Sequence, residues 1–212
     1  MPLNLTITAP GETTLEIKKS RFICYVARIT DESDAKQIIN EVRLAHPKAN
    51  HHCFAYVLGD QDQIQRESDA GEPSGTAGVP ILEVLKRKRV HNVISVVTRY
   101  FGGVKLGVGG LIRAYSNATS QTIDSVGLVN LVTQTRLALS IPYSSYDQLV
   151  YDLNEAHVLI EETSYATDVT VHVSVDRQSV EQFKQQIRNR FNNQVTFVEG
   201  TDHFAEVPYK LN

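Results

Sequence analysis

The 212-residue chain contains no tryptophan, one methionine and two cysteines. Two cysteines, Cys24 and Cys53, are too few for a disulfide or zinc framework, so we interpret both as reduced thiols in the core. No apolar run approaches the roughly 18–20 residues of a membrane span, so no membrane contact is predicted. The N-terminal residues lack a basic segment followed by an apolar one, which predicts a cytoplasmic rather than a secreted protein.

Acidic residues are missing from one part of the chain. Averaged over all residues, a formal net charge of −3 argues against a nucleic-acid partner. From Val84 to Ile123, however, there is no Asp or Glu but seven Lys or Arg, so this segment carries +7 and the remainder −10. Eight of the 12 glycines fall between residues 71 and 110. We therefore expect the functional chemistry to be concentrated in this region.

Hydrophobic periodicity predicts an α+β protein. In the first part it indicates strands near residues 15–17, 21–29, 52–58 and 93–101, and helices near 35–45, 80–89 and 110–126. After Gly127 the pattern restarts as β-α-β-β-α-β, the order of a ferredoxin-like sandwich. The sequence therefore predicts two domains, 1–130 and 131–212, joined near residues 127–135.

The segment from Arg99 to Tyr115 leaves a predicted strand through five glycines and enters a predicted helix. Such a turn allows backbone N–H groups to converge at the positive end of the helix dipole, which favours a bound anion. Alternatively, the glycines permit only a tight turn, and the nearby cations point into water. The residues predicted for an anion or nucleic-acid site are Lys86, Arg87, Lys88, Arg89, Arg99, Gly102, Gly103, Lys105, Gly109, Gly110 and Arg113.

A second polar loop, from Arg66 to Pro80, also leads into a helix. Its hydroxyl groups are candidates to donate to phosphate, and its carboxylates to hold a metal or act as a base. Turn formation and helix capping are the alternative interpretation for each residue. The candidate ligand residues of this loop are Glu67, Asp69, Glu72, Ser74 and Thr76.

Established site motifs are absent. A P-loop needs Gly-Lys-Ser/Thr at its end, but Val108 and Gly109 follow Gly107. His51 and His52 are adjacent on a predicted strand, so their side chains should point to opposite faces. The other histidines show no paired ligand spacing. We therefore predict no metal site and no cofactor, and identify no catalytic residue.

The segments Arg66-Glu-Ser-Asp-Ala-Gly-Glu-Pro-Ser-Gly-Thr-Ala-Gly-Val-Pro80 and Thr98-Arg-Tyr-Phe-Gly-Gly-Val-Lys-Leu-Gly-Val-Gly-Gly-Leu-Ile-Arg-Ala-Tyr115 closely resemble the Impact family, in its bacterial YigZ-like branch. The resemblance covers essentially the whole chain. It implies a first domain like the α+β fold shared by a ribosomal small-subunit protein and the fourth domain of elongation factor G. It implies a second domain like that factor's fifth, ferredoxin-like domain. Eukaryotic members resemble regulators of translation that compete for the co-activator of an initiation-factor kinase.

Two functional hypotheses follow. The leading one is a cytoplasmic regulatory protein linked to translation, which binds RNA or a ribosome-associated partner through a basic, glycine-rich face. Its second domain would contribute contacts with a protein partner. The alternative is an enzyme acting on a nucleotide or a small phosphorylated metabolite bound between the two glycine loops. A protein–protein adaptor is a third reading.

Overall fold

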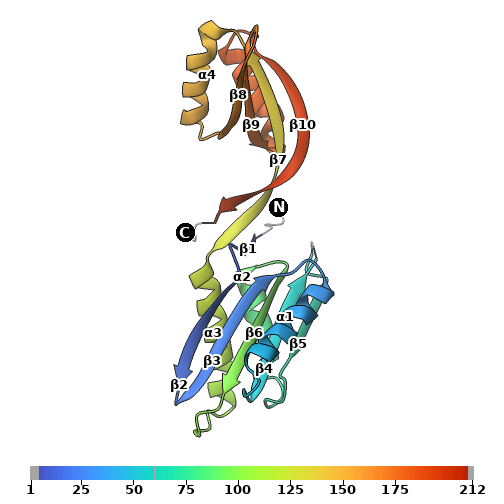
Figure 1. Cartoon of the computed structure of the whole chain (residues 1–212), viewed down its shortest axis with the longest axis vertical. Helices are drawn as coiled ribbons and strands as arrows, with labels where there is room; N and C mark the ends of the chain where they lie inside the picture. The colour runs from blue at the N-terminus through green and yellow to red at the C-terminus, as the bar shows by residue number, and fades with distance from the viewer. Residues whose placement is uncertain (1–4, 60, 210–212) are drawn as a thin grey trace. The chain divides into compact units, whose positions relative to one another are not determined.

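The structure is a computed structural model that describes residues 5–59 and 61–209 (Figure 1). The described residues divide into two compact units, one up to residue 131 together with 207–209 and the other from 132–206. The boundary lies inside a continuous strand, β7 (Leu128–Ile141), where the sequence indicated a joint near residues 127–135. Both units pack helices against a sheet, and the predicted α+β class is confirmed.

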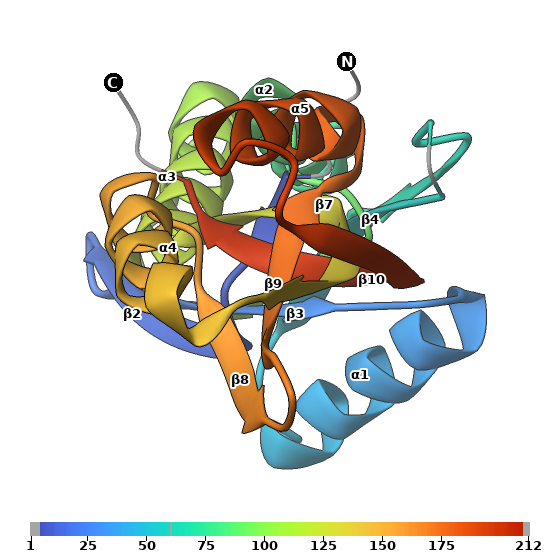
Figure 2. The ribbon, with the colours of Figure 1, turned by 90° about the horizontal axis from the view of Figure 1, so that it is seen from above.

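The first unit is built on a five-stranded sheet in which each strand is antiparallel to its neighbours. Helix α1 covers one face of this sheet, and α2 and α3 lie over the other (Figure 2). In sheet order the strands are β2 (Gly11–Ile17), β3 (Ser20–Arg28), β6 (Val93–Tyr100), β4 (His51–Leu58) and β5 (Ile64–Ser68). The helices are α1 (Glu32–Ala45), α2 (Gly78–Lys88) and α3 (Val108–Val126).

The central strand β6 explains how the site is positioned. Helices cover both of its faces, which is why it is an almost continuous apolar run. Val93 and Val97 belong to the core beneath α2 and α3, whereas Ile94 and Val96 belong to the core beneath α1. Because side chains alternate along a strand, Arg99 is directed to the α3 side of the sheet.

The second unit has the predicted β-α-β-β-α-β order. Its helices and strands share one core, which contains apolar residues from both helices and from the inner face of the sheet. Its strands lie in the order β8, β9, β7, β10. After β7 come α4 (Tyr143–Glu155), β8 (Ile160–Tyr165), β9 (Val169–Asp176), a short 3-10 turn η1 (Arg177–Ser179), α5 (Val180–Arg190) and β10 (Thr196–Pro208).

Two short strands were not predicted. Strand β1 (Leu5–Ile7) pairs with the first residues of β7. Among the described strands, β5 pairs with β4 alone, and its three central residues are exposed and polar, so it lacks the alternation that identifies a half-buried strand. Across the described ranges, no helix combines the length and the apolar character needed to cross a membrane.

Candidate functional site

A cleft of about 460 Å³ opens in the first unit where β6 ends and β4 begins. One side is formed by the loop that follows β5, and the other by the glycine-rich loop that connects β6 to α3. The apolar part of the lining includes Phe101, Leu106 and Leu111. The charged and polar side chains in the lining are Asn50, His51, Glu72, Arg99 and Lys105.

A buried ion pair forms the inner wall of the cleft. Arg99 Nη1 donates to Glu72 Oε1 at 2.6 Å, and only 6% and 3% of the two side chains are exposed. The Tyr115 hydroxyl donates to the same carboxylate oxygen at 2.8 Å. The Arg99 guanidinium also lies over the rings of Phe22 and Phe101, 5.3 and 5.5 Å from their centroids. These contacts fix both charges in place, and removing one partner would leave the other charge buried.

His51 faces this ion pair from the start of β4. Its Nδ1 lies 3.0 Å from the carbonyl oxygen of Ala70. Because a carbonyl only accepts, Nδ1 must donate, and Nε2 is left facing Glu72 Oε2 at 3.9 Å. The neighbouring His52 turns to the opposite face and contacts Thr98, which confirms the predicted divergence of the two histidines.

Cys53 lies beneath the cleft and is not a suitable nucleophile. Its Sγ is 2.9 Å from the carbonyl oxygen of Asp69 and 3.4 Å from the Tyr115 hydroxyl. Burial raises the pKa of Cys53 to about 12 and also raises the pKa of Tyr115 above its usual value of 10.0. At neutral pH both groups are therefore protonated, and they act as structural hydrogen-bonding groups.

Asp69 organises the loop after β5. Its Oδ1 accepts from the backbone N–H groups of Ala77 and Gly78, both at 2.9 Å, at the start of α2. Its Oδ2 accepts from Gly75 N–H at 2.7 Å. Burial opposes ionisation of Asp69, but these backbone hydrogen bonds outweigh it and hold its pKa below the usual 3.8. This carboxylate therefore caps the helix.

The other predicted residues of this loop have different surroundings. Thr76 is buried, and its hydroxyl donates to the carbonyl oxygen of Pro73. Glu67 and Ser74 are exposed. Of the five predicted loop residues, Glu72 alone lines the cleft.

The run Lys86-Arg87-Lys88-Arg89 lies at the other end of α3. Lys88 Nζ contacts Asp124 Oδ1 at 2.6 Å, and Lys86 Nζ contacts Glu83 Oε1 at 2.8 Å. Asp124 is 16 residues beyond Val108, where α3 begins. At about 1.5 Å per residue, this separation is about 24 Å along the helix. The structure therefore separates this run from the cleft, and acids partner two of its four cations.

The strand register brings three connections together at the cleft end of the sheet: the β2–β3 turn, the loop after β6 and the loop before β4. Ile17 pairs with Ser20, Arg21 with Tyr100 and His51 with Arg99, so the β2–β3 turn lies beside the end of β6 and the start of β4. A Cβ built on Gly102 would lie 2.0 Å from the backbone carbon of Lys19. Glycine is thus required at 102, because the loop after β6 packs directly on the β2–β3 turn.

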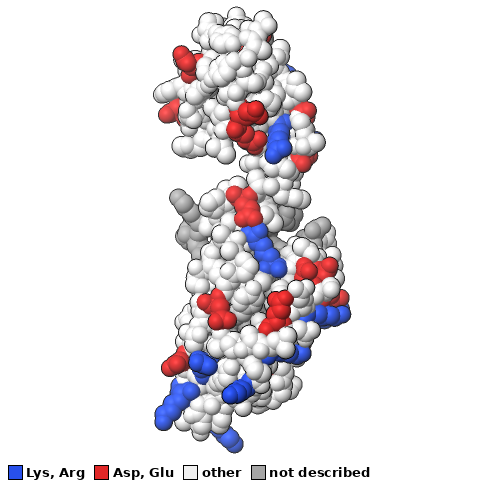
Figure 3. Space-filling model, viewed as in Figure 1, with Lys and Arg blue, Asp and Glu red and all other residues white. Residues whose placement is uncertain are grey.

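These loops and the first turns of α3 display exposed cations. Figure 3 shows Lys and Arg side chains gathered at the lower end of the visible face, where the β2–β3 turn and the loop after β6 lie in Figure 1. Glu16, opposite Arg21 in the β2–β3 pair, is an exposed acid beside them. We call this set the basic rim: Lys18, Lys19, Arg21, Lys48, Lys105 and Arg113, all exposed.

Helix α3 begins at the cleft without a side-chain cap. Its N-cap, Gly107, has φ 72° and no side chain to accept a hydrogen bond, and the first turn contains no acid. The four glycines predicted for the site belong to this loop and turn: Gly102 and Gly103 follow β6, while Gly109 and Gly110 are in the first turn of α3. The first-turn N–H groups therefore present positive partial charge without a side-chain acceptor.

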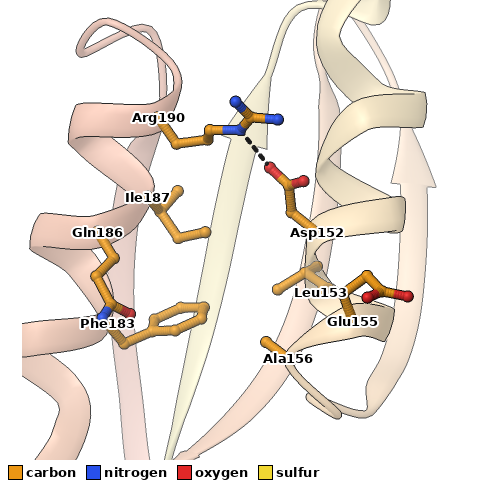
Figure 4. A pocket seen from close by; sticks show the side chains of 8 residues that line it. All are labelled: Asp152, Leu153, Glu155, Ala156, Phe183, Gln186, Ile187 and Arg190. Atoms are coloured by element: carbon orange, nitrogen blue, oxygen red, sulfur yellow. Dashed lines mark hydrogen bonds and ion pairs between the residues drawn. The ribbon is translucent and has the colours of Figure 1, made fainter.

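The second unit has a different surface. A groove of about 470 Å³ lies between α4 and α5 (Figure 4). Arg190 Nε donates across it to Asp152 Oδ2 at 2.9 Å, and this hydrogen bond lowers the pKa of Asp152. From Val132 to Glu206 there are five Lys or Arg and eleven Asp or Glu, so this unit is acidic. Within the parts of the chain that are described, no group of three His, Cys, Asp or Glu is placed to hold a metal ion.

Fold and site together define a two-domain α+β protein with an Impact-type first domain. The family model described as "Impact N-terminal domain" matches residues 18–123, and one described as "Domain of unknown function (DUF1949)" matches residues 139–194. The chain is 39% identical to the IMPACT family member YvyE of Bacillus subtilis, over 95% of this chain and 93% of that protein.

Other relatives agree with this assignment. The IMPACT family member YigZ of Escherichia coli is 35% identical, over 84% of this chain and 89% of its own. A crystal structure described as that of a hypothetical protein matches with a TM-score of 0.60 at 32% identity, covering 93% of this chain and 97% of that one. The chain belongs to the IMPACT family.

Proposed function

We propose that the protein binds RNA through the basic rim, either as free RNA or within a ribosome-associated partner. It would act in the cytoplasm as a regulatory protein linked to translation, the role that the family resemblance implies. The observation that carries the proposal is the gathering of six exposed cations beside the uncapped first turn of α3. Both features attract phosphate groups, and neither depends on base sequence.

The charge count gives a measurable expectation. Single-stranded nucleic acids lose affinity with salt at a log–log slope of roughly −0.7 per neutralised phosphate, so six contacts predict a slope near −4. Buried Arg99 does not count toward this slope, because Glu72 already neutralises it. Lys86 and Lys88 likewise have acidic partners.

The test is the binding of a labelled single-stranded RNA, followed by fluorescence anisotropy between about 50 and 200 mM salt. Lys105→Ala should weaken binding and reduce the slope by about 0.7. Lys36→Ala is the matched control, since Lys36 is an exposed cation in the first turns of α1. This end of the helix lies away from the cleft, because Glu32 contacts Tyr56 in the second half of β4, whereas the cleft is at the start of β4. An absence of binding at low salt, or equal effects of the two substitutions, would exclude the proposal.

A second candidate is an enzyme that acts on a nucleotide or a small phosphorylated metabolite. It is favoured by one observation: Glu72, Arg99 and Lys105 converge on a single cleft between the two predicted loops. A thermal-shift screen with nucleotides and sugar phosphates tests it, because a ligand at about 100 times its Kd adds about 2.7 kcal/mol of stability. If no compound raises the Tm, this candidate loses its support.

A further inference from the structure

The inner wall of the cleft carries two hydrogen-bond acceptors that face each other. Glu72 Oε1 already accepts from Arg99 and Tyr115, whereas Oε2 has no hydrogen bond among the described residues. His51 Nε2 is 3.9 Å from Oε2, too far for a direct hydrogen bond, and Nδ1 of the same ring donates to Ala70. A carboxylate oxygen accepts, and so does Nε2 in the tautomer that carries the ring's one proton on Nδ1, so a group that donates suits the space between them.

The surrounding charges limit what that donor is. A second carboxylate or phosphate at this point would be repelled by Glu72, and an ammonium group would be repelled by Lys105, which also lines the cleft. A neutral hydroxyl group meets neither penalty. Acidic side chains bind sugar hydroxyls in this way at the ribose of dinucleotides.

The outer part of the cleft offers complementary groups for the rest of a nucleotide. Lys105 and the uncapped first turn of α3 lie where a phosphate would be stabilised. Phe101 is 46% exposed and forms part of the wall, so its aromatic side chain is suited to stack on a base. Arg99 Nε is buried without a hydrogen-bond partner in the described chain, so this wall has unused donor capacity as well. The volume of about 460 Å³ is in the range of small-ligand sites.

We propose that this cleft binds a ribonucleotide whose sugar hydroxyl shares its single proton between Glu72 Oε2 and His51 Nε2 in a three-centre hydrogen bond, with its phosphate at Lys105 and the first turn of α3. The ribonucleotide is either free or one unit of an RNA strand. The inference rests on the proposed RNA-binding function and adds selectivity to it. The basic rim attracts any phosphate backbone, whereas the Glu72–His51 pair distinguishes RNA from DNA through the sugar hydroxyl.

The first experiment changes the ligand and leaves the protein intact. Anisotropy compares an RNA strand with the DNA strand of the same sequence at low salt. Losing a hydrogen bond to a charged acceptor should weaken binding of the DNA about 10-fold to 100-fold. Unlabelled ribonucleoside 5′-monophosphates are then added as competitors, beside their 2′-deoxy and 3′-deoxy forms. Displacement by the ribonucleotides identifies a free nucleotide as a ligand, whereas displacement by RNA strands alone identifies a unit of RNA.

The second experiment changes the acceptor. His51→Ala should abolish the preference for RNA over DNA, whereas His52→Ala should keep it, because the adjacent histidine lies on the opposite face of β4. Circular dichroism and the Tm establish that both variants are folded. Equal affinity of the wild-type chain for RNA and DNA, or a preference that survives His51→Ala, overturns this inference but not the proposed function. Failure to bind either strand at low salt overturns the proposed function itself.

Discussion

The buried pair of Glu72 and Arg99 should dominate the stability of the first unit. Glu72→Ala removes a carboxylate whose side chain is 3% exposed, and it leaves the Arg99 charge, 6% exposed, without its partner at 2.6 Å. The Tyr115 hydroxyl loses its acceptor in the same step. Breaking a buried pair in this way costs about 3–5 kcal/mol. That loss is comparable with the lower end of the total stability of a domain, about 5 kcal/mol.

Two further variants separate charge burial from packing. Replacing both residues together, Glu72→Met with Arg99→Met, removes both charges and fills similar volume, so it should cost much less than Glu72→Ala. Asp124→Ala is the exposed control. It breaks the 2.6 Å contact with Lys88, but the aspartate side chain is 50% exposed, so the loss should stay below about 1 kcal/mol.

The cysteines supply an assay that reports on the first unit alone. Cys24 and Cys53 are both buried, and both belong to this unit. Their reaction with a thiol reagent in increasing urea therefore measures its unfolding separately from that of the second unit. The reasoning is refuted if Glu72→Ala loses no more stability than Asp124→Ala. It is also refuted if the double Met variant is as unstable as Glu72→Ala.

Two other substitutions test the loops that form the cleft. Asp69→Asn should destabilise the chain by about 1 kcal/mol at neutral pH, because the carboxylate caps α2. The folded-state pKa of Asp69 lies below 3.8, so the difference in unfolding free energy between wild type and Asp69→Asn should be complete above that pH. This difference should disappear as the pH falls through the lowered pKa. Urea unfolding at a series of pH values measures it. Gly102→Ala should lower the Tm and weaken RNA binding, because its Cβ would lie 2.0 Å from the Lys19 backbone. In Gly103→Ala the new Cβ would meet no atom within 4 Å, so that variant has only the backbone strain of a φ of 83°. Equal RNA affinity of Gly102→Ala and wild type would show that the packing of this loop does not position the rim.

The elements that sequence periodicity identified are those with strong apolar patterns. Strand β6 and helix α3 bury long apolar faces, and both were predicted within about two residues. Strand β5 was missed because its centre is polar and exposed. Strand β10 runs from Thr196 to Pro208 although most of its residues are exposed, because its pairing with β7 supports it.

The residues of the cleft were harder to find than the fold. Arg99, Lys105 and Glu72 were singled out, but no local pattern shows that Arg99 and Glu72, 27 residues apart, are partners. Asn50, His51 and Tyr115 were not predicted for the site. His51 enters it because the β4–β6 register places it opposite Arg99, and register is set by strand pairing rather than by spacing within either segment.

The cations that cluster along the sequence are not the ones that form most of the basic rim in the structure. Of the seven cations between Val84 and Ile123, Lys86, Lys88 and Arg99 have acidic partners in the structure. Most of the basic rim comes instead from outside that segment, as Lys18, Lys19, Arg21 and Lys48. If the rim is the anion-binding surface, the salt dependence of binding must follow these residues. Neutralising Lys18 and Lys19 should then reduce the slope, while neutralising Lys86 and Lys88 should leave it unchanged, although a charge count along the sequence favours the second pair.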